Sequence, residues 1–136
     1  MADRTIIQQN LKNALIKTDF SGFTKIHTGK VRDTYEKDGK RIIVTTDRQS
    51  AFDRVLAAIP FKGAVLNQFS NFWFDKTKDI VPNHLIAMPD PNVSIVKKVN
   101  IFPVEVVVRG YITGTTSTSA WYNYEQGERL FCGNQL

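Results

Sequence analysis

Hydrophobic and polar positions alternate in three short segments of the first third of the chain, a pattern typical of β-strands. The segments are residues 24–28, 31–36 and 41–46. Asp38-Gly39 separates the last two, and Asp-Gly between strand patterns predicts a tight hairpin. Gly29 separates the first two and places a glycine at the tip of a second hairpin. The pattern therefore predicts an antiparallel meander of three strands.

Helical spacing flanks this meander on both sides. Asp3 can cap a first helix that runs to about Lys17. Residues 65–79 predict a second helix, and residues 119–126 a third. One face of the second helix carries a stripe of large apolar side chains, which favours packing in the core. The members of this apolar stripe are Leu66, Phe69, Phe72 and Trp73.

Two more strands are predicted at residues 94–99 and 104–111, with loops at residues 47–51, 62–63 and 89–92. Helices that flank a meander and further strands favour an α+β fold with a largely antiparallel sheet.

Composition restricts the class of protein further. The chain has 136 residues, of which 42% are hydrophobic, enough for a globular core. Cys132 is the single cysteine, so no internal disulfide can form and a reduced, cytoplasmic setting is expected. The apolar runs are shorter than the ~20 residues of a membrane helix. The net charge of +5 favours anionic partners, but the basic residues are dispersed, unlike the stripe expected for nucleic-acid binding.

Three segments could carry chemistry. In Gly29-Lys30-Val31-Arg32, a turn glycine lets backbone N–H groups approach a phosphate, and two basic side chains supply countercharge. The alternative is a solvated basic surface. The segment 47–53 gathers two carboxylates, a guanidinium and a hydroxyl in one loop that could orient a polar substrate. The alternative is an internally paired loop in which Asp47 or Asp53 caps a helix.

The third segment, residues 104–114, begins as a β-branched strand and ends in a loop between two glycines, Gly110 and Gly114. Arg109 stands where the strand meets the loop. Its planar fork suits a phosphate or carboxylate, although a salt bridge after a core strand would explain it equally. The hydroxyl residues 115–119 could form a phosphate-binding loop or a linker ending in a helix cap at Ser119.

Together these segments resemble the family of phosphoribosylaminoimidazole-succinocarboxamide synthase, or SAICAR synthetase. The resemblance covers residues from about 23 to the end, with the motifs in the family's order. The motifs are Gly29 to Tyr35, Thr46 to Asp53, Lys62-Gly63, Val81 to His84, Val104 to Gly114, and Ser119-Ala120-Trp121.

The resemblance implies an ATP-dependent carbon–nitrogen ligase of purine biosynthesis. Such an enzyme joins L-aspartate to carboxyaminoimidazole ribonucleotide through an acyl phosphate, using ATP and magnesium. It also implies a kinase-like or ATP-grasp-like ATP-binding lobe in residues 1–100. Residues 101–136 would form a hinge and the beginning of a second domain.

The resemblance also implies roles for individual residues. Residues expected to border ATP are Gly29, Lys30, Val31, Arg32, Val96, Lys98 and Glu105. Residues expected to bind the other substrates are Ser50, Asp53, Arg109, Gly110 and Ser119, with Lys30 and Arg109 as catalytic groups. In compact members of the family, the serine that matches Ser119 follows almost directly after the glycine that matches Gly114. Here residues 115–118 intervene, so Thr115 or Ser117 could take the place of Ser119.

The family's enzymes continue well beyond this length, and their acidic magnesium ligands lie in the later part. We therefore expect no synthetase activity from these 136 residues alone. Two other classes fit parts of the pattern. A different phosphotransferase with a kinase-like lobe would share the glycine turn but has no need of Arg109-Gly110 after the hinge. A basic nucleic-acid-binding module would show steep salt dependence and surface aromatic residues.

Overall fold

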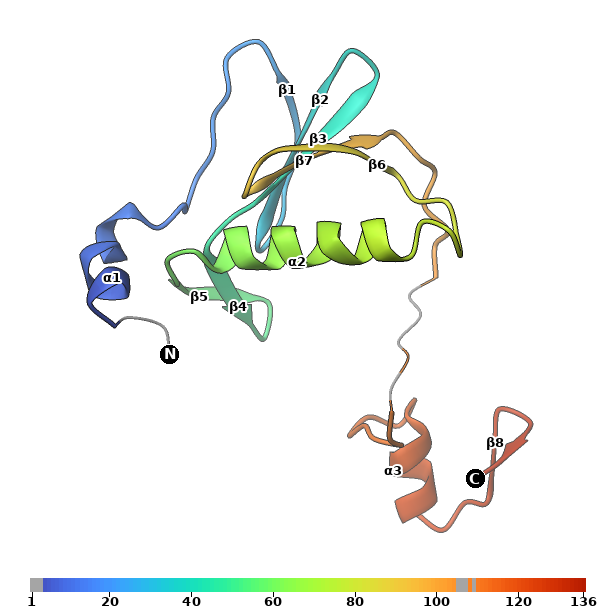
Figure 1. Ribbon diagram of the computed structural model, residues 1–136. Coiled ribbons are helices and arrows are strands. Elements are labelled where there is room, and N and C mark those ends of the chain that lie inside the picture. The colour runs from blue at the N-terminus through green and yellow to red at the C-terminus, as the bar shows by residue number, and fades with distance from the viewer. Residues whose placement is uncertain (1–3, 105–107, 109) are drawn as a thin grey trace. The chain divides into compact units, whose positions relative to one another are not determined.

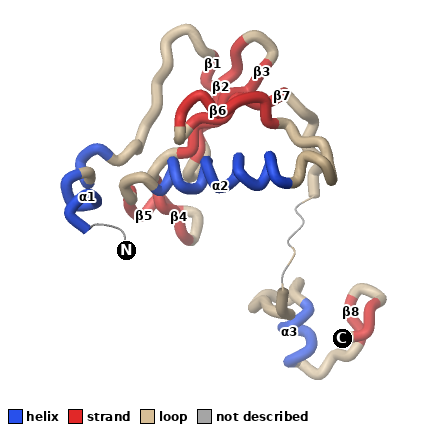
Figure 2. Tube along the Cα trace, viewed as in Figure 1, coloured by secondary structure: helices blue, strands red, loops and turns tan. Residues whose placement is uncertain are grey.

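An antiparallel sheet of five strands organises the N-terminal part of the chain (Figures 1 and 2). The computed structural model describes residues 4–104, 108 and 110–136. The spatial order of the strands is β1-β2-β3-β7-β6, and every neighbouring pair is antiparallel. The strands are β1 (Thr24–Thr28), β2 (Arg32–Lys37), β3 (Lys40–Thr45), β6 (Leu85–Asp90) and β7 (Val93–Lys97).

The predicted meander is confirmed, with boundaries within one residue of those expected. Asp38 and Gly39 have φ angles of 51° and 70° and close the two-residue turn between β2 and β3. Positive φ at both central residues matches the twist of the flanking strands, which is why Asp-Gly is a hairpin signal. The expected α+β class with a largely antiparallel sheet is therefore confirmed.

One face of the sheet carries the small apolar core. Tyr35, Ile42 and Val44 are buried together, with Leu15, Val93 and Ile95 packed against them. Tyr35 pairs with Ile42 across the ladder, and Ile42 pairs with Ile95, so the three strands present these side chains to the same face. We call this side the core face.

Helix α2 (Lys62–Lys76) crosses the opposite face of the sheet, which we call the helix face (Figure 1). The helix approaches through a polar row, Gly63, Asn67 and Asn71, spaced four residues apart and buried. Asn67 Oδ1 accepts a hydrogen bond from Ser94 Oγ at 2.8 Å, and Asn71 Nδ2 donates to the same hydroxyl at 2.9 Å. A Cβ on Gly63 would lie 2.2 Å from the Thr45 carbonyl oxygen, so only glycine permits this approach.

The prediction that the apolar stripe packs in the core is wrong. Its four side chains, Leu66, Phe69, Phe72 and Trp73, are all exposed. The physical reason is that the side-chain amides of Asn67 and Asn71 both hydrogen-bond the Ser94 hydroxyl at the helix face, so the helix is oriented by hydrogen bonds rather than by its apolar side.

Four further expectations about local structure are corrected. The segment expected as a loop at 47–51 is a strand, β4 (Arg48–Ala51), and it pairs with β5 (Arg54–Ala58). The turn expected at 62–63 is the first turn of α2. The loop expected at 89–92 includes the end of β6. The first helix is short, because α1 (Arg4–Gln9) is followed only by the 3-10 helix η1 (Leu11–Asn13).

The chain divides into two compact units, residues 1–100 and 101–136. The second unit contains α3 (Ala120–Glu125), β8 (Leu130–Phe131) and β9 (Asn134–Gln135). The helix expected at 119–126 is thus confirmed. Of the strand expected at 104–111, residues 105–107 and 109 lie outside the described residues, and the others are not in a strand. In the part of the chain that the structure describes, no helix has the length and apolar character to cross a membrane.

Candidate functional site

The turn between β1 and β2 is formed by Gly29, Lys30 and Val31, where the sequence predicts an anion-binding loop. The Gly29 N–H donates to the Arg32 carbonyl at 2.7 Å. A Cβ on Gly29 would lie 3.1 Å from that same oxygen, closer than ordinary van der Waals contact. Glycine at this position therefore lets the turn close tightly. We call Gly29, Lys30 and Val31 the glycine turn.

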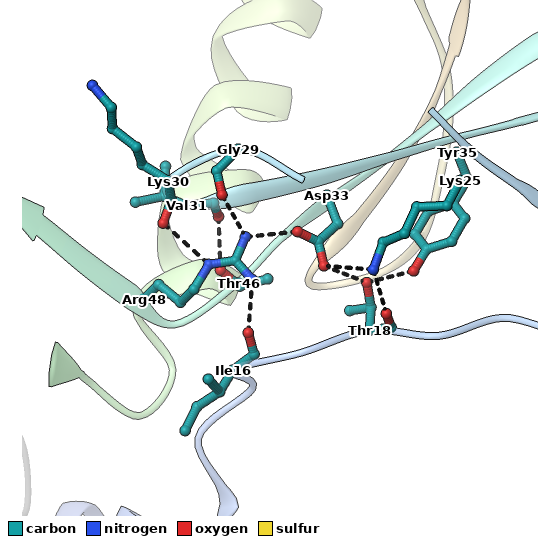
Figure 3. A network of polar contacts seen from close by, with 10 residues as sticks. All are labelled: Ile16, Thr18, Lys25, Gly29, Lys30, Val31, Asp33, Tyr35, Thr46 and Arg48. Atoms are coloured by element: carbon teal, nitrogen blue, oxygen red, sulfur yellow. Dashed lines mark hydrogen bonds and ion pairs between the residues drawn. The ribbon is translucent and has the colours of Figure 1, made fainter. Parts of the chain in front are cut away.

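All three carbonyl groups of the glycine turn accept hydrogen bonds from the segment that follows β3 (Figure 3). Arg48 Nη2 donates to the Gly29 carbonyl at 3.0 Å, and Arg48 Nε donates to the Lys30 carbonyl at 3.1 Å. The Val31 carbonyl accepts from both the backbone N–H and the hydroxyl of Thr46, at 2.9 and 2.8 Å. The conformation of the turn is thus fixed by residues well separated from it in sequence.

Arg48 is itself held by a buried polar network on the core face. Its Nη2 lies 2.7 Å from Asp33 Oδ1, and its Nη1 donates to the Ile16 carbonyl at 2.7 Å. Thr18 Oγ1 donates to the other Asp33 oxygen at 2.6 Å. Burial by itself would raise the pKa of the Asp33 carboxyl. The hydrogen bonds from Arg48 and Thr18, together with the positive charges of Arg48 and Lys25, outweigh burial and hold the pKa below its usual value.

Lys30 contacts a second predicted site residue, Asp53. The Lys30 side chain extends away from the Arg48 guanidinium (Figure 3) and forms an ion pair with the Asp53 carboxylate. Asp53 stands at the tip of the β4–β5 hairpin, where Phe52 and Asp53 have φ angles of 49° and 64°. The hydrogen bond from Lys30 lowers the pKa of the Asp53 carboxyl. The structure thus brings one residue predicted for ATP beside one predicted for the other substrates.

A cavity of about 220 Å³ lies between the helix face of the sheet and α2. Arg32 and Val96, both predicted to border ATP, contribute to its lining. They come from strands β2 and β7, which flank β3, and the β3 residues Ile43 and Thr45 line the cavity between them. On the helix side the lining includes Asn67.

Other predicted site residues lie elsewhere. Lys98 donates to Glu36 Oε1 at 2.9 Å and does not line the cavity. Ser50 is half-buried in β4, opposite Val55 in the hairpin. Gly110 is exposed in the second unit. Glu105 and Arg109 lie outside the described residues.

In the second unit, Gly114 and Ser119 touch despite the four residues between them. A Cβ on Gly114 would lie 2.3 Å from Ser119 Cβ, and Gly114 has a φ of 130°, in the region that favours glycine. The Ser119 hydroxyl donates to the Thr116 carbonyl at 2.7 Å and accepts from the Tyr122 N–H at 3.4 Å. The four residues 115–118 therefore form a loop that leaves Ser119 next to Gly114.

Sequence reasoning missed the network residues Thr18 and Asp33, and it assigned Arg48 only to a substrate loop. The signal was present, because the period of two along β2 places Asp33 on the same face as Tyr35. A carboxylate on a core face needs a partner. For Asp47, the alternative of a carboxylate at a helix end is confirmed in part: it accepts from the Gly63 N–H in the first turn of α2 and from the Leu15 N–H, both at 2.8 Å. Both partners lie outside the segment 47–53, so the loop is not paired internally through Asp47.

Two solved structures share this architecture. The SAICAR synthase from Saccharomyces cerevisiae complexed with SAICAR superposes with a TM-score of 0.72 at 35% identity, covering 83% of this chain and 45% of that one. A type-2 SAICAR synthetase in complex with ADP gives a TM-score of 0.61 at 26% identity, covering 82% of this chain and 46% of that one. This α+β lobe thus has the fold of SAICAR synthase structures.

Sequence comparison specifies the family. The family model for SAICAR synthetase matches residues 25–132. A phosphoribosylaminoimidazole-succinocarboxamide synthase of Legionella pneumophila is 65% identical over 82% of this chain, and a chloroplastic one of Vigna aconitifolia is 50% identical over 98%. The chain belongs to the SAICAR synthetase family. It spans 36% of the length of the Legionella relative and 39% of the Vigna relative.

Proposed function

We propose that this chain forms the ATP-binding part of a ligase that joins L-aspartate to carboxyaminoimidazole ribonucleotide. Residues 1–100 serve as the ATP-binding lobe, and residues 101–136 begin the part that holds the ribonucleotide. Family membership supports the proposal, and so do the names of relatives solved with SAICAR and with ADP.

The observation that carries the proposal is the orientation of the glycine turn. Its carbonyl oxygens face Arg48 and Thr46, so their partial negative charges are directed away from the side on which Lys30 extends. An anion on that outer side meets an ammonium group and backbone N–H groups rather than carbonyl oxygens. The triphosphate of ATP is the anion that the family's reaction supplies.

The chemistry has two steps. A carboxylate oxygen of the ribonucleotide attacks the γ-phosphorus of ATP, the bond to the β-phosphate oxygen breaks, and ADP leaves. The amine of aspartate then attacks the carbonyl carbon of the acyl phosphate. Phosphate leaves, and the amine loses a proton as the amide forms. Phosphoryl transfer depends mainly on positioning and on neutralising charge, and Lys30 supplies a positive charge at the turn.

The cavity beneath the sheet suits part of the nucleotide. Its volume of about 220 Å³ is below the roughly 300–1,000 Å³ of pockets that enclose a whole ligand. We assign Arg32 and Val96 to its nucleotide contacts. Lys98 and Glu105 remain proposed neighbours of the adenine, at the hinge that follows β7.

The remaining substrates are assigned by position in the family's motifs. Arg109 and Ser119, with Gly110, hold the phosphate of the ribonucleotide, and Ser50 and Asp53 shape the imidazole-carboxylate or aspartate side. Among the described residues, no group of three or more His, Cys, Asp or Glu side chains could hold a metal ion. We place the magnesium ligands outside this chain, where the bound ion would neutralise phosphate charge. A cytoplasmic setting also stays a prediction, since the Vigna relative is named as chloroplastic.

The competing classes receive less support. A kinase-like phosphotransferase would not explain a family match that continues to residue 132. A nucleic-acid-binding module is expected to show surface aromatic residues, and the aromatic side chains Phe69, Phe72 and Trp73 of α2 are exposed. The family match argues against this class.

Activity measurements test the proposal. We use "full-length synthetase" for a chain in which these 136 residues are followed by the rest of the family's sequence. It should form SAICAR only when ATP, aspartate and the ribonucleotide are all present, with release of ADP and phosphate. Product formation without ATP, or ATP hydrolysis that ignores the ribonucleotide, would contradict the proposed reaction.

A further inference from the structure

Each nitrogen of the Arg48 guanidinium already donates a hydrogen bond within the protein. Nε, Nη1 and Nη2 together donate to three backbone carbonyls and to Asp33. Arg48 is only 7% exposed. These hydrogen bonds and its burial favour an effect of Arg48 through the groups that it holds rather than through direct contact with a ligand.

Two of those groups are consecutive carbonyls of the glycine turn, Gly29 and Lys30. In a trans peptide, the N–H of the following residue points opposite to the carbonyl, and the described residues contain no cis peptide. Turning the Gly29 and Lys30 carbonyls toward Arg48 therefore turns the N–H groups of Lys30 and Val31 to the outer side. Within the part of the chain that the structure describes, neither of these N–H groups donates a backbone hydrogen bond.

Thr46 completes the arrangement at the third peptide. Its backbone N–H and its hydroxyl both donate to the Val31 carbonyl, and Thr46 is fully buried. The three successive carbonyls of the glycine turn are thus all held on the side that faces Arg48 and Thr46. Consecutive backbone N–H groups of a turn, together with a lysine of the same turn, are a donor set suited to phosphate oxygens.

We propose that Arg48 is a positioning residue for ATP, which orients the glycine turn so that the Lys30 and Val31 N–H groups face the phosphates. This inference rests on the proposed function, since it takes ATP as the anion. Asp33 is the counterpart that holds Arg48, through its 2.7 Å contact with Nη2. The arginine fork is required because a lysine at position 48 would keep the charge but could not donate to both carbonyls and to Asp33 in one plane.

The test compares two substitutions within the same network. Arg48→Lys keeps the charge beside Asp33 and loses the fork. Thr18→Val is the matched control, because Thr18 contacts Asp33 and Tyr35 at the other end of the network and does not contact the glycine turn. Steady-state kinetics of the full-length synthetase give KM for ATP, KM for aspartate and kcat, and thermal unfolding reports the stability of each variant.

We expect Arg48→Lys to raise KM for ATP about tenfold, since a ~1 Å displacement of positioning groups can cost up to about a hundredfold. KM for aspartate should stay near its original value. Thr18→Val should lower the unfolding temperature while KM for ATP stays unchanged. If Arg48→Lys lowers the unfolding temperature as Thr18→Val does and leaves KM for ATP unchanged, Arg48 is only structural and the inference is overturned.

A second variant covers the case in which Arg48→Lys fails to fold. Thr46→Val is nearly isosteric, removes one of the two hydrogen bonds to the Val31 carbonyl, and leaves the Asp33–Arg48 pair intact. It should raise KM for ATP by a smaller factor than Arg48→Lys; an unchanged value would overturn the inference. The unmodified full-length synthetase separates the two failures. If it does not use ATP, the proposed function fails. If it uses ATP and the variants keep its KM for ATP, only the role of Arg48 fails.

Discussion

Asp33 and Arg48 form an ion pair in which both side chains are almost completely buried. Their closest atoms lie 2.7 Å apart, and the side chains are 1% and 8% exposed. Removing two charges from water is costly, and such a pair is tolerated only when further hydrogen bonds satisfy both groups. Here Thr18 satisfies the carboxylate, and three backbone carbonyls satisfy the guanidinium. The pair therefore links the core face of the sheet to the glycine turn.

Asp33→Asn should destabilise the chain strongly, because it leaves the Arg48 charge buried without its partner. Breaking a buried pair from one side costs about 3–5 kcal/mol. Denaturant unfolding of the 136-residue chain measures the difference. Asp75→Asn is the control, since Asp75 forms an exposed pair with Lys78 and should leave the free energy of unfolding almost unchanged. Equal losses in the two variants would show that burial does not govern the strength of the pair.

The same carboxylate makes stability depend on pH. The pKa of Asp33 is lower in the folded state than the ordinary pKa of an aspartate carboxyl. A carboxyl with a depressed folded pKa stabilises the fold fully above its unfolded pKa, and this contribution is lost as the pH falls through the folded pKa. The free energy of unfolding of the unmodified chain should therefore fall as the pH drops below the unfolded pKa. In Asp33→Asn the dependence over the same range should be weaker; identical pH profiles would contradict this assignment.

Local sequence signals correctly predicted those elements whose conformation depends on neighbouring residues alone. Asp38-Gly39 determines its hairpin, because the φ angles it needs are available to these two residues. The orientation of α2 could not be predicted from its apolar stripe. It depends on hydrogen bonds that join Asn67 and Asn71 to Ser94, which lies 27 and 23 residues further along the sequence. The same holds for the site, since the glycine turn was visible in the sequence but the arginine that holds it belongs to another hairpin.

Gly63 tests how closely α2 approaches the sheet. Gly63→Ala places a methyl group 2.2 Å from the Thr45 carbonyl oxygen, so the helix must move away from β3. Overpacking of this kind costs about 1–3 kcal/mol or more. Gln68→Ala, at an exposed position of the same helix, should change the free energy of unfolding by less than about 0.5 kcal/mol. Denaturant unfolding of both variants provides the comparison, and a neutral Gly63→Ala would mean that α2 can move away from β3 at no cost in stability.

Lys30 is expected to exchange Asp53 for a phosphate of ATP. Both side chains are largely exposed, 57% for Lys30 and 85% for Asp53, and exposed ion pairs are weak. An anion with more charge can therefore displace the carboxylate at little cost. Lys30→Ala should raise KM for ATP or depress kcat in the full-length synthetase. Lys40→Ala, an exposed lysine at the start of β3, is the control. Unchanged ATP kinetics in Lys30→Ala would remove this residue from its assigned role.

Arg109→Ala should weaken binding of the ribonucleotide far more than binding of ATP, because we assign its guanidinium to the ribonucleotide phosphate. Separate titrations of the full-length synthetase with each ligand measure the two affinities. An equal loss for both ligands, or no loss for either, would contradict the assignment.

Ser119 is expected to complete the same phosphate site, since it lies against Gly114 even though residues 115–118 intervene. Ser119 also caps α3, so Ser119→Ala alone would not separate the two roles. Ser119→Asp keeps a capping oxygen but places a negative charge where the phosphate would bind. If Ser119 contacts the phosphate, Ser119→Asp should raise KM for the ribonucleotide at least as much as Ser119→Ala, and Ser117→Ala should leave it unchanged. If Ser119→Asp behaves like the unmodified enzyme, Ser119 is only a cap; if Ser117→Ala raises KM instead, the hydroxyl of the phosphate site belongs to the intervening loop.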